Sequence, residues 1–228
     1  MGYGKVFSRT FTALTFATAP LAVMSVAATP AMAQSSGVKG ILGDASDNAL
    51  DKLSEPGAFY ADKAVRILLP GPLQKATSIL RFTSKAGLTK DITKTLNDAA
   101  GKVALEAKPV FRSAIDGLTL QDGVGIVTGG QEAGTEYLQR TSGMELAAKV
   151  RPLVEKALGD LGAYQQVERL GSISALARLG GADISRDGLT DSVTDQAMEG
   201  IFTYIGKEEA NFRRNPLDKG KKLLKGIF

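Results

Sequence analysis

The chain has 228 residues, enough for one domain with a substantial core, and it contains no cysteine, histidine or tryptophan. Their absence excludes disulfide bonds and both Ser-His and Cys-His nucleophile pairs, and it removes the usual ligands of zinc and haem. Acid–base chemistry near neutral pH would therefore fall to carboxylates, lysines or tyrosines. The net charge is +4, and it falls to +2 without Lys5 and Arg9, which is too small to indicate a nucleic-acid-binding protein.

Residues 1–33 have the layout of a secretory signal peptide. Lys5 and Arg9 precede an apolar run, and the small residues Ala31 and Ala33 close the segment. The alternative is an uncleaved membrane anchor, but threonines and a proline dilute the run, and a span needs about 20 strongly apolar residues. We expect cleavage after Ala33 and delivery to the periplasm of a Gram-negative type of cell by the general export pathway.

The next part of the chain predicts short elements. Residues 34–43 are small and polar, and we expect a flexible lead-in there. A short helix is predicted over residues 44–53. Residues 65–69 are a brief apolar run that local preference would make a strand. Prolines follow at once, and they suit the first turn of a helix running from 70 to about 85.

The strongest periodicity begins at Thr89, a good N-cap. Apolar residues then recur every three or four positions, which predicts an amphipathic helix. These residues are Ile92, Leu96, Ala99, Val103, Ala107, Val110 and Ala114. Pro109 lies inside this pattern and predicts a kink or break near Lys108.

The remaining pattern is helical as well. A sequence resembling a capping box at 119–122 predicts a short helix that ends at Gly129-Gly130. Further helices are predicted over 132–140, 144–161 and 165–179. All are short enough to pack into one domain.

The C-terminal part predicts one long helix and one short one. The long helix starts at Asp187 or Thr190 and stops at Asn215-Pro216, and residues 217–228 form a short basic amphipathic helix. No fixed-period repeat or linker divides the chain. We therefore predict an all-α fold, a single compact domain of about seven to nine helices over residues 44–228.

One segment matches the first half of a calcium loop. Asp183, Ser185 and Asp187 stand at alternate positions before Gly188, as oxygen ligands and a sharp turn require. The twelfth position is Thr194 instead of a bidentate Glu. The alternative is ordinary turn and capping chemistry. We expect no resident metal or cofactor.

Carboxylates are the candidate catalytic residues. Asp122, Glu132, Glu136 and Glu145 cluster in the sequence, and Glu132 and Glu136 would share a helix face. Two acids at a suitable separation could hydrolyse a glycosidic bond. The alternative is a solvated helix face.

The last sixteen residues hold most of the basic character. With the leader removed the net charge falls to +2, whereas this tail carries six basic residues against one acid, Asp218. The basic residues are Arg213, Arg214, Lys219, Lys221, Lys222 and Lys225. They could contact an anionic membrane surface or an envelope protein. Alternatively, the apolar face of the tail docks on the domain and the lysines face water.

Several short pieces together resemble a known family. In chain order they are Val65–Pro70, Asp122–Ile126 with Gly129-Gly130, Thr135-Glu136-Tyr137 with Arg140-Thr141, and a block comprising Val193, Ala197, Gly200, Phe202, Glu208-Glu209, Arg213, Pro216 and Leu223–Lys225. Over about residues 42–228 the chain resembles the bacterial domain of unknown function 4197, a group of exported, mostly helical proteins. Gly134 stands where the resemblance leads us to expect Ala, and Leu138 where we expect Phe. The resemblance implies an all-helical exported domain and carries no reaction, ligand or catalytic residue.

These observations leave three functional hypotheses. The first is a non-enzymatic envelope protein with a binding or structural role. The second is a helical pocket for an apolar small molecule or lipid, framed by kinks at Pro109 and Pro152. The third is a carboxylate-based cell-wall hydrolase, which needs two of the named acids in one cleft.

Overall fold

The structure is a computed structural model of the chain that describes residues 30–71, 73–74, 86–119, 126, 128–171 and 185–215. Every regular element in these residues is a helix, so the described part is all-α as predicted. It contains six helices, against the seven to nine expected for the whole domain: α1 (Pro30–Ser54), α2 (Ala58–Ala61), α4 (Ala86–Gly117), α6 (Ala133–Asp160), α7 (Ala163–Gly171) and α9 (Arg186–Arg214). Within the described ranges, no helix is both long enough and apolar enough to cross a membrane.

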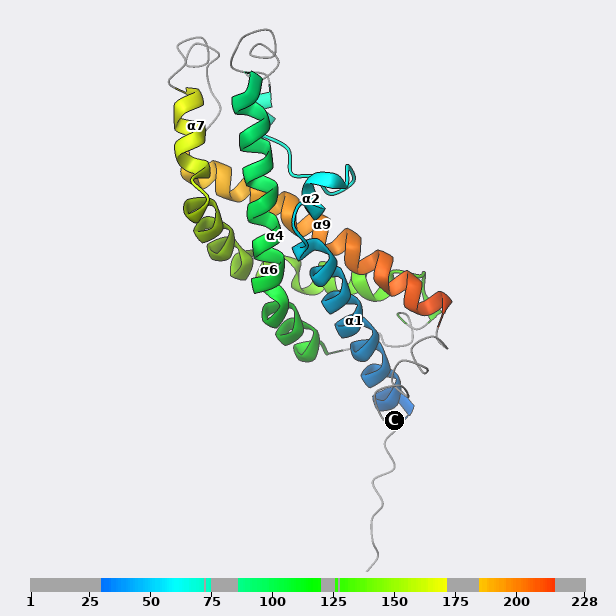
Figure 1. Ribbon diagram of the computed structural model, residues 1–228. Coiled ribbons are helices and arrows are strands. Elements are labelled where there is room, and N and C mark those ends of the chain that lie inside the picture. Colours follow the sequence, from blue (N-terminus) through cyan, green and yellow to red (C-terminus); the bar gives the residue numbers. More distant parts are fainter. Residues whose placement is uncertain are drawn as a thin grey trace, which may run out of the picture.

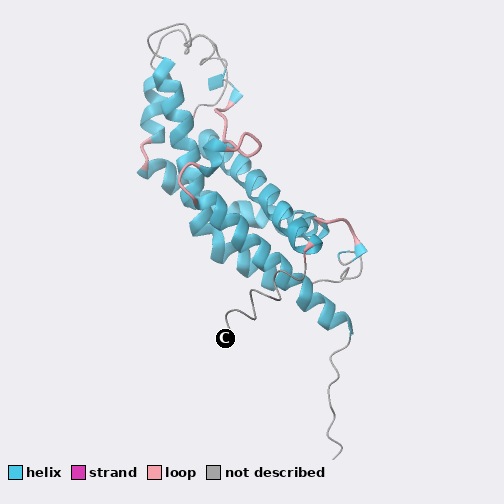
Figure 2. Ribbon diagram, turned by 45° about the vertical axis from the view of Figure 1, so that its right-hand side comes forward, coloured by secondary structure: helices cyan, strands magenta, loops and turns pink. Residues whose placement is uncertain are grey.

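Four long helices form the body. α1 packs against α4 and α9, and α6 packs against the same two helices. The diagonal pairs, α1 with α6 and α4 with α9, touch much less. α7 lies beside one end of α4, far from the start of α1 (Figure 1). Figure 2 shows that the described helices together make an elongated body.

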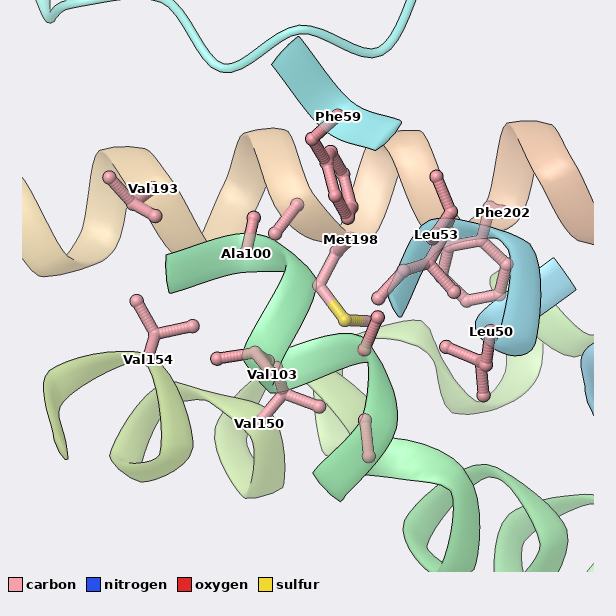
Figure 3. Close-up of a cluster of buried hydrophobic side chains, with 14 of the residues drawn as sticks. Leu50, Leu53, Phe59, Ala100, Val103, Val150, Val154, Val193, Met198 and Phe202 are labelled. Atoms are coloured by element: carbon pink, nitrogen blue, oxygen red, sulfur yellow. The ribbon is translucent and has the colours of Figure 1, made fainter. Parts of the chain in front are cut away.

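Apolar side chains from all four long helices fill the centre of this body. Figure 3 shows side chains from α1, α4, α6 and α9 converging there, including Leu50, Leu53, Val103, Val150, Val154, Met198 and Phe202. Phe111 of α4 meets Phe202 of α9 edge to face, with ring centroids 5.8 Å apart. Burying one such side chain contributes roughly 1.5–3 kcal/mol, so this core supplies the main stabilisation of a chain without disulfides.

The helix predicted from periodicity is α4, and it continues through Pro109. The predicted apolar line is buried from Ile92 to Ala107. Beyond the proline the fully buried positions are Phe111 and Ile115, while the predicted Val110 and Ala114 are only partly buried. Pro109 itself is exposed, so its ring and missing N–H lie on the solvent side, where a helix tolerates them best.

Two predicted helices, 132–140 and 144–161, are one helix, α6. Thr141 lies in the expected break, and its hydroxyl donates to the carbonyl of Tyr137, four residues earlier, at 2.8 Å. Gly143 costs about 1 kcal/mol against Ala in a helix but does not stop it. Leu138 and Leu146 are buried on either side, so packing carries the helix across the gap.

Helix boundaries elsewhere agree in part with expectation. α1 begins at Pro30, so the expected flexible lead-in, 34–43, is helical, because Val38 and Leu42 extend the buried face of the predicted helix. α9 begins one residue before Asp187, the earlier of its two predicted starts, and ends one residue before the predicted stop at Asn215. Its apolar residues Leu189, Val193, Ala197, Ile201 and Ile205 are buried. The leader up to residue 29, the predicted helix over 217–228 and most of those over 70–85 and 119–130 lie outside the described residues.

Candidate functional site

The carboxylate of Glu209, on α9, is fully buried at the start of α6. Its oxygens accept hydrogen bonds from the backbone N–H of Gly134 at 3.0 Å and of Thr135 at 2.7 Å, and from the Thr135 hydroxyl at 2.7 Å. Arg213, one turn later on α9, donates to the same carboxylate at 2.9 and 2.7 Å. We call Gly134, Thr135, Glu209 and Arg213 the Glu209 cluster.

The Glu209 cluster meets the needs of a helix N-terminus. The first backbone N–H groups of a helix have no partner within it, and they lie at the positive end of its dipole. Glu209 supplies a negative charge and two acceptors to these groups from another helix. A Cβ at Gly134 would lie 2.8 Å from the Glu209 Oε1 and 3.0 Å from Leu42 Cδ2, so a larger residue here would require one of these side chains to shift.

Two further bonds tie the chain on both sides of residues 120–125 to this region. Arg213 donates to the carbonyl of Ile126 at 3.0 Å, and the Tyr137 hydroxyl donates to the carbonyl of Thr119 at 3.0 Å. The Arg140 guanidinium lies over the Tyr137 ring, 5.3 Å from its centroid. Arg213 and Tyr137 therefore hold the carbonyls of Ile126 and Thr119 beside the start of α6.

The chemistry of the Glu209 cluster is that of a structural ion pair. The carboxylate accepts from two backbone amides, one hydroxyl and one guanidinium, and no part of it is exposed. A general acid or base has to reach the proton that it transfers. Glu209 instead accepts from the start of α6 and from Arg213 of its own helix, so it joins α6 to α9.

Residues 65–69 form a second polar junction. Burial alternates along the run, with Val65, Ile67 and Leu69 buried and Leu68 51% exposed. The expected strand is not formed, because no other strand pairs with these residues within the described part of the chain. The backbone of the run is bound by amide side chains from two helices.

Asn97 of α4 donates to the Ile67 carbonyl at 2.9 Å and accepts from the Ile67 N–H at 2.8 Å. Gln196 of α9 makes the same pair of bonds to Leu68, at 3.0 and 2.8 Å. Successive residues of an extended chain direct their N–H and C=O groups to opposite sides. The two amides therefore satisfy both edges of the segment, which lies between α4 and α9.

The predicted catalytic carboxylates that the structure describes are on the exposed surface of α6 and at its start. Glu132, Glu136 and Glu145 are exposed on or beside α6, and Asp122 lies outside the described residues. Glu136 and Glu145 are separated by about 13 Å of helix axis, more than the roughly 5–9 Å of paired glycosidase acids. The ammonium of Lys149, 2.6 Å from Glu145, lowers the pKa of that carboxyl, opposite to what a general acid needs.

The predicted calcium residues have other partners. Ser185 is the N-cap of α9 and accepts from the Gly188 N–H at 3.0 Å. Asp187 pairs with Arg151 of α6 at 3.0 Å. Asp183 lies outside the described residues, which contain no cluster of three or more potential metal-ligating side chains of Asp, Glu, His or Cys.

The structure describes two of the predicted surface-binding residues, and their environments differ. The Arg213 side chain is 19% exposed and is engaged in the Glu209 cluster. Arg214 is exposed and donates to Asn211 and to the carbonyl of Ala210 on its own helix. Lys219, Lys221, Lys222 and Lys225 lie outside the described residues.

Sequence reasoning did not find the pair of Asp62 and Tyr204. The Tyr204 hydroxyl donates to Asp62 at 2.8 Å, and Asp62 also accepts from the Ala64 N–H at 2.9 Å. Burial and the hydrogen bond to Asp62 raise the pKa of Tyr204 to about 12, and the two donors lower the pKa of Asp62. The pair fixes the chain after α2 to α9 across 142 positions, a distance over which no local sequence signal operates.

Three valines on the helices that contain Pro109 and Pro152 belong to the core. Val103 of α4 and Val150 and Val154 of α6 are 0–1% exposed and lie in the buried cluster (Figure 3). The pocket framed by the two prolines stays a prediction.

Comparison with known proteins gives one match. A family model described as "Protein of unknown function (DUF4197)" matches residues 29–228. Neither the curated proteins nor the solved structures provide a significant match. The structure brings Thr135, from one piece of the resemblance, into a cluster with Glu209 and Arg213, from another. Because the family model covers most of the sequence, the chain belongs to the DUF4197 family of proteins of unknown function.

Proposed function

We propose that this is an exported, periplasmic and non-enzymatic envelope protein whose helical body carries a basic tail, residues 216–228, to an anionic membrane surface. One observation carries the proposal. The tail contains four lysines against a single acid, and it also contains Leu223, Leu224, Ile227 and Phe228, which could enter a lipid surface.

The contacts of Arg213 reduce the set of residues that we assign to the membrane-binding surface. Arg213 is occupied by Glu209, so it belongs to the body and not to the binding surface. α9 ends at Arg214, and the tail follows directly from a helix whose last turns are fixed to α6. The four tail lysines, and not Arg213, are the groups that we assign to surface contact.

Export is supported by the position of the leader. The basic start, the apolar run and Ala31-Met32-Ala33 have the order that a signal peptidase recognises. The family match begins at residue 29, so nearly all of the leader precedes it. A binding role agrees with the partners of two described carboxylates, since Glu209 accepts from the start of α6 and Glu145 pairs with Lys149.

Vesicle binding by a charge-reversed tail tests the proposal. The variant Lys221→Glu/Lys222→Glu/Lys225→Glu should lose co-sedimentation with phosphatidylglycerol-containing vesicles. Each basic residue near an anionic surface contributes about 1 kcal/mol, so the loss should be a hundredfold or more. The parent protein should not sediment with phosphatidylcholine vesicles.

The matched control reverses three exposed lysines of the body, Lys63, Lys102 and Lys149, for the same change in net charge. It should retain more binding than the tail variant. Equal binding by the tail variant and the parent protein, or equal losses in both variants, would refute the proposal.

A further inference from the structure

The sulfur atoms of the described side chains occupy two opposite environments. Met144 on α6 is 91% exposed, whereas Met198 on α9 is 6% exposed and packs in the core. The chain has no cysteine, so thioethers supply all of its sulfur chemistry. A thioether reacts with two-electron oxidants when they can reach it.

The position of Met144 follows from the helix period. The buried line of α6 runs through Leu146, Val150 and Val154. Met144 precedes Leu146 by two residues, which places it about 200° around the axis, on the opposite side of the helix. Its neighbour Glu145 is exposed too and pairs with Lys149, so this face of α6 is open to solvent.

We propose that Met144 is a reversible sulfoxidation site for two-electron oxidants of the hydrogen peroxide class. A sulfur lone pair attacks one peroxide oxygen, the O–O bond breaks, and the products are the sulfoxide and one water. The sulfur loses two electrons and the peroxide gains them. A dithiol reductant reverses the step, taking the oxygen away as water and becoming a disulfide.

The fold decides which sulfur tolerates this change. At Met144 the new sulfoxide oxygen would point into water, and no core contact would be lost. At Met198 it would lie among Leu53, Val103 and Phe59, where a strong dipole would have no water (Figure 3). Oxidation of the folded protein should therefore mark Met144 and leave the core intact, independently of what the tail binds.

Graded peroxide treatment of the full-length protein, followed by peptide mass mapping, tests this proposal. The peptide containing Met144 should gain one oxygen at a rate close to that of free methionine, and the peptide containing Met198 at least tenfold more slowly. In denaturing urea the two rates should converge. A methionine sulfoxide reductase with its dithiol should remove the oxygen from Met144.

Two variants test which methionine accounts for the fast oxygen uptake. Met144→Leu should abolish fast uptake on the peptide that spans α6, and Met198→Leu should leave it unchanged. The urea midpoint should be the same before and after Met144 takes up its oxygen. The proposal is overturned if Met144 stays reduced at peroxide levels that oxidise free methionine, if Met198 reacts as fast in the folded protein, if the reductase leaves the sulfoxide in place, or if oxidation of Met144 lowers the midpoint.

Discussion

Two arginine–carboxylate clusters join α6 to α9, with the same chemistry in opposite surroundings. In the Glu209 cluster the side chains of Glu209 and Arg213 are 1% and 19% exposed. At the other junction, Arg151 of α6 pairs with Asp187 and Asp191 of α9, and these three side chains are 36%, 81% and 58% exposed. Distances are similar, at 2.7 Å for the first pair and 3.0 and 2.6 Å for the second.

This difference shows that the length of an ion pair alone does not determine how much the pair contributes to stability. Water can replace either partner of Arg151 when the pair opens, and salt screens the attraction. Water does not reach Glu209, whose oxygens also satisfy two backbone amides of α6. Removing one partner there would leave buried donors and a charge without compensation.

The largest predicted effect is therefore at Glu209. Glu209→Ala leaves the Gly134 and Thr135 amides and the Arg213 guanidinium without their acceptor. We expect the free energy of unfolding to fall by about 3–5 kcal/mol, measured by urea denaturation followed by circular dichroism.

Glu199→Ala is the control for this change, because Glu199 is exposed on the same helix. It should stay within about 0.5 kcal/mol of the parent protein. A loss of stability at Glu209 no larger than that at Glu199 would show that burial does not make the Glu209 cluster more stabilising than the exposed Arg151 pairs.

A smaller effect is expected for Gly134→Ala, which changes the packing of the Glu209 cluster and not its charge. Gly134→Ala would place a Cβ against Glu209 and Leu42, and overpacking of this kind costs about 1–3 kcal/mol. Gly143→Ala on the same helix meets only Gln139 Cγ, at 3.8 Å, and should instead gain up to about 1 kcal/mol from helix propensity. The opposite signs should be visible in thermal midpoints. Stabilisation by both substitutions would mean that Glu209 can retreat from α6 at little cost.

The sequence predicts those parts of the molecule that depend on local periodicity. The inward line of α9 and most of that of α4 could be located because apolar residues recur at helical spacing. The break predicted between residues 140 and 144 was wrong, because Leu138 and Leu146 pack on the same core and carry α6 through Gly143. Tertiary packing therefore keeps residues 140–144 helical, although the local sequence pattern predicted a break there.

The polar junctions depend on partners far apart in the chain, which periodicity does not pair. Thr135 and Glu209 are 74 positions apart, and Ile67 and Asn97 are 30 apart. The available signal for the Glu209 cluster was the spacing of Glu209 and Arg213, four apart on a predicted helix. For residues 65–69 the apolar run was visible, but neither Asn97 nor Gln196 could be named as the group that binds its backbone in place of a neighbouring strand.

The smallest predicted effect is at Arg151, and the same substitution at Arg213 provides the comparison. Arg151→Met keeps the apolar stem of the side chain and removes its ion pairs with Asp187 and Asp191, whose hydrogen bonds raise the pKa of Arg151. The loss of stability should be small at low salt and should vanish near 1 M salt, where the Debye length is about 3 Å. Arg213→Met strands a buried carboxylate, so its loss should be several times larger and should persist at the same salt concentration. Equal salt dependence in the two variants would mean that the Arg213 pair is solvated like the Arg151 pairs. The two junctions would then differ only in the backbone amides that donate to Glu209.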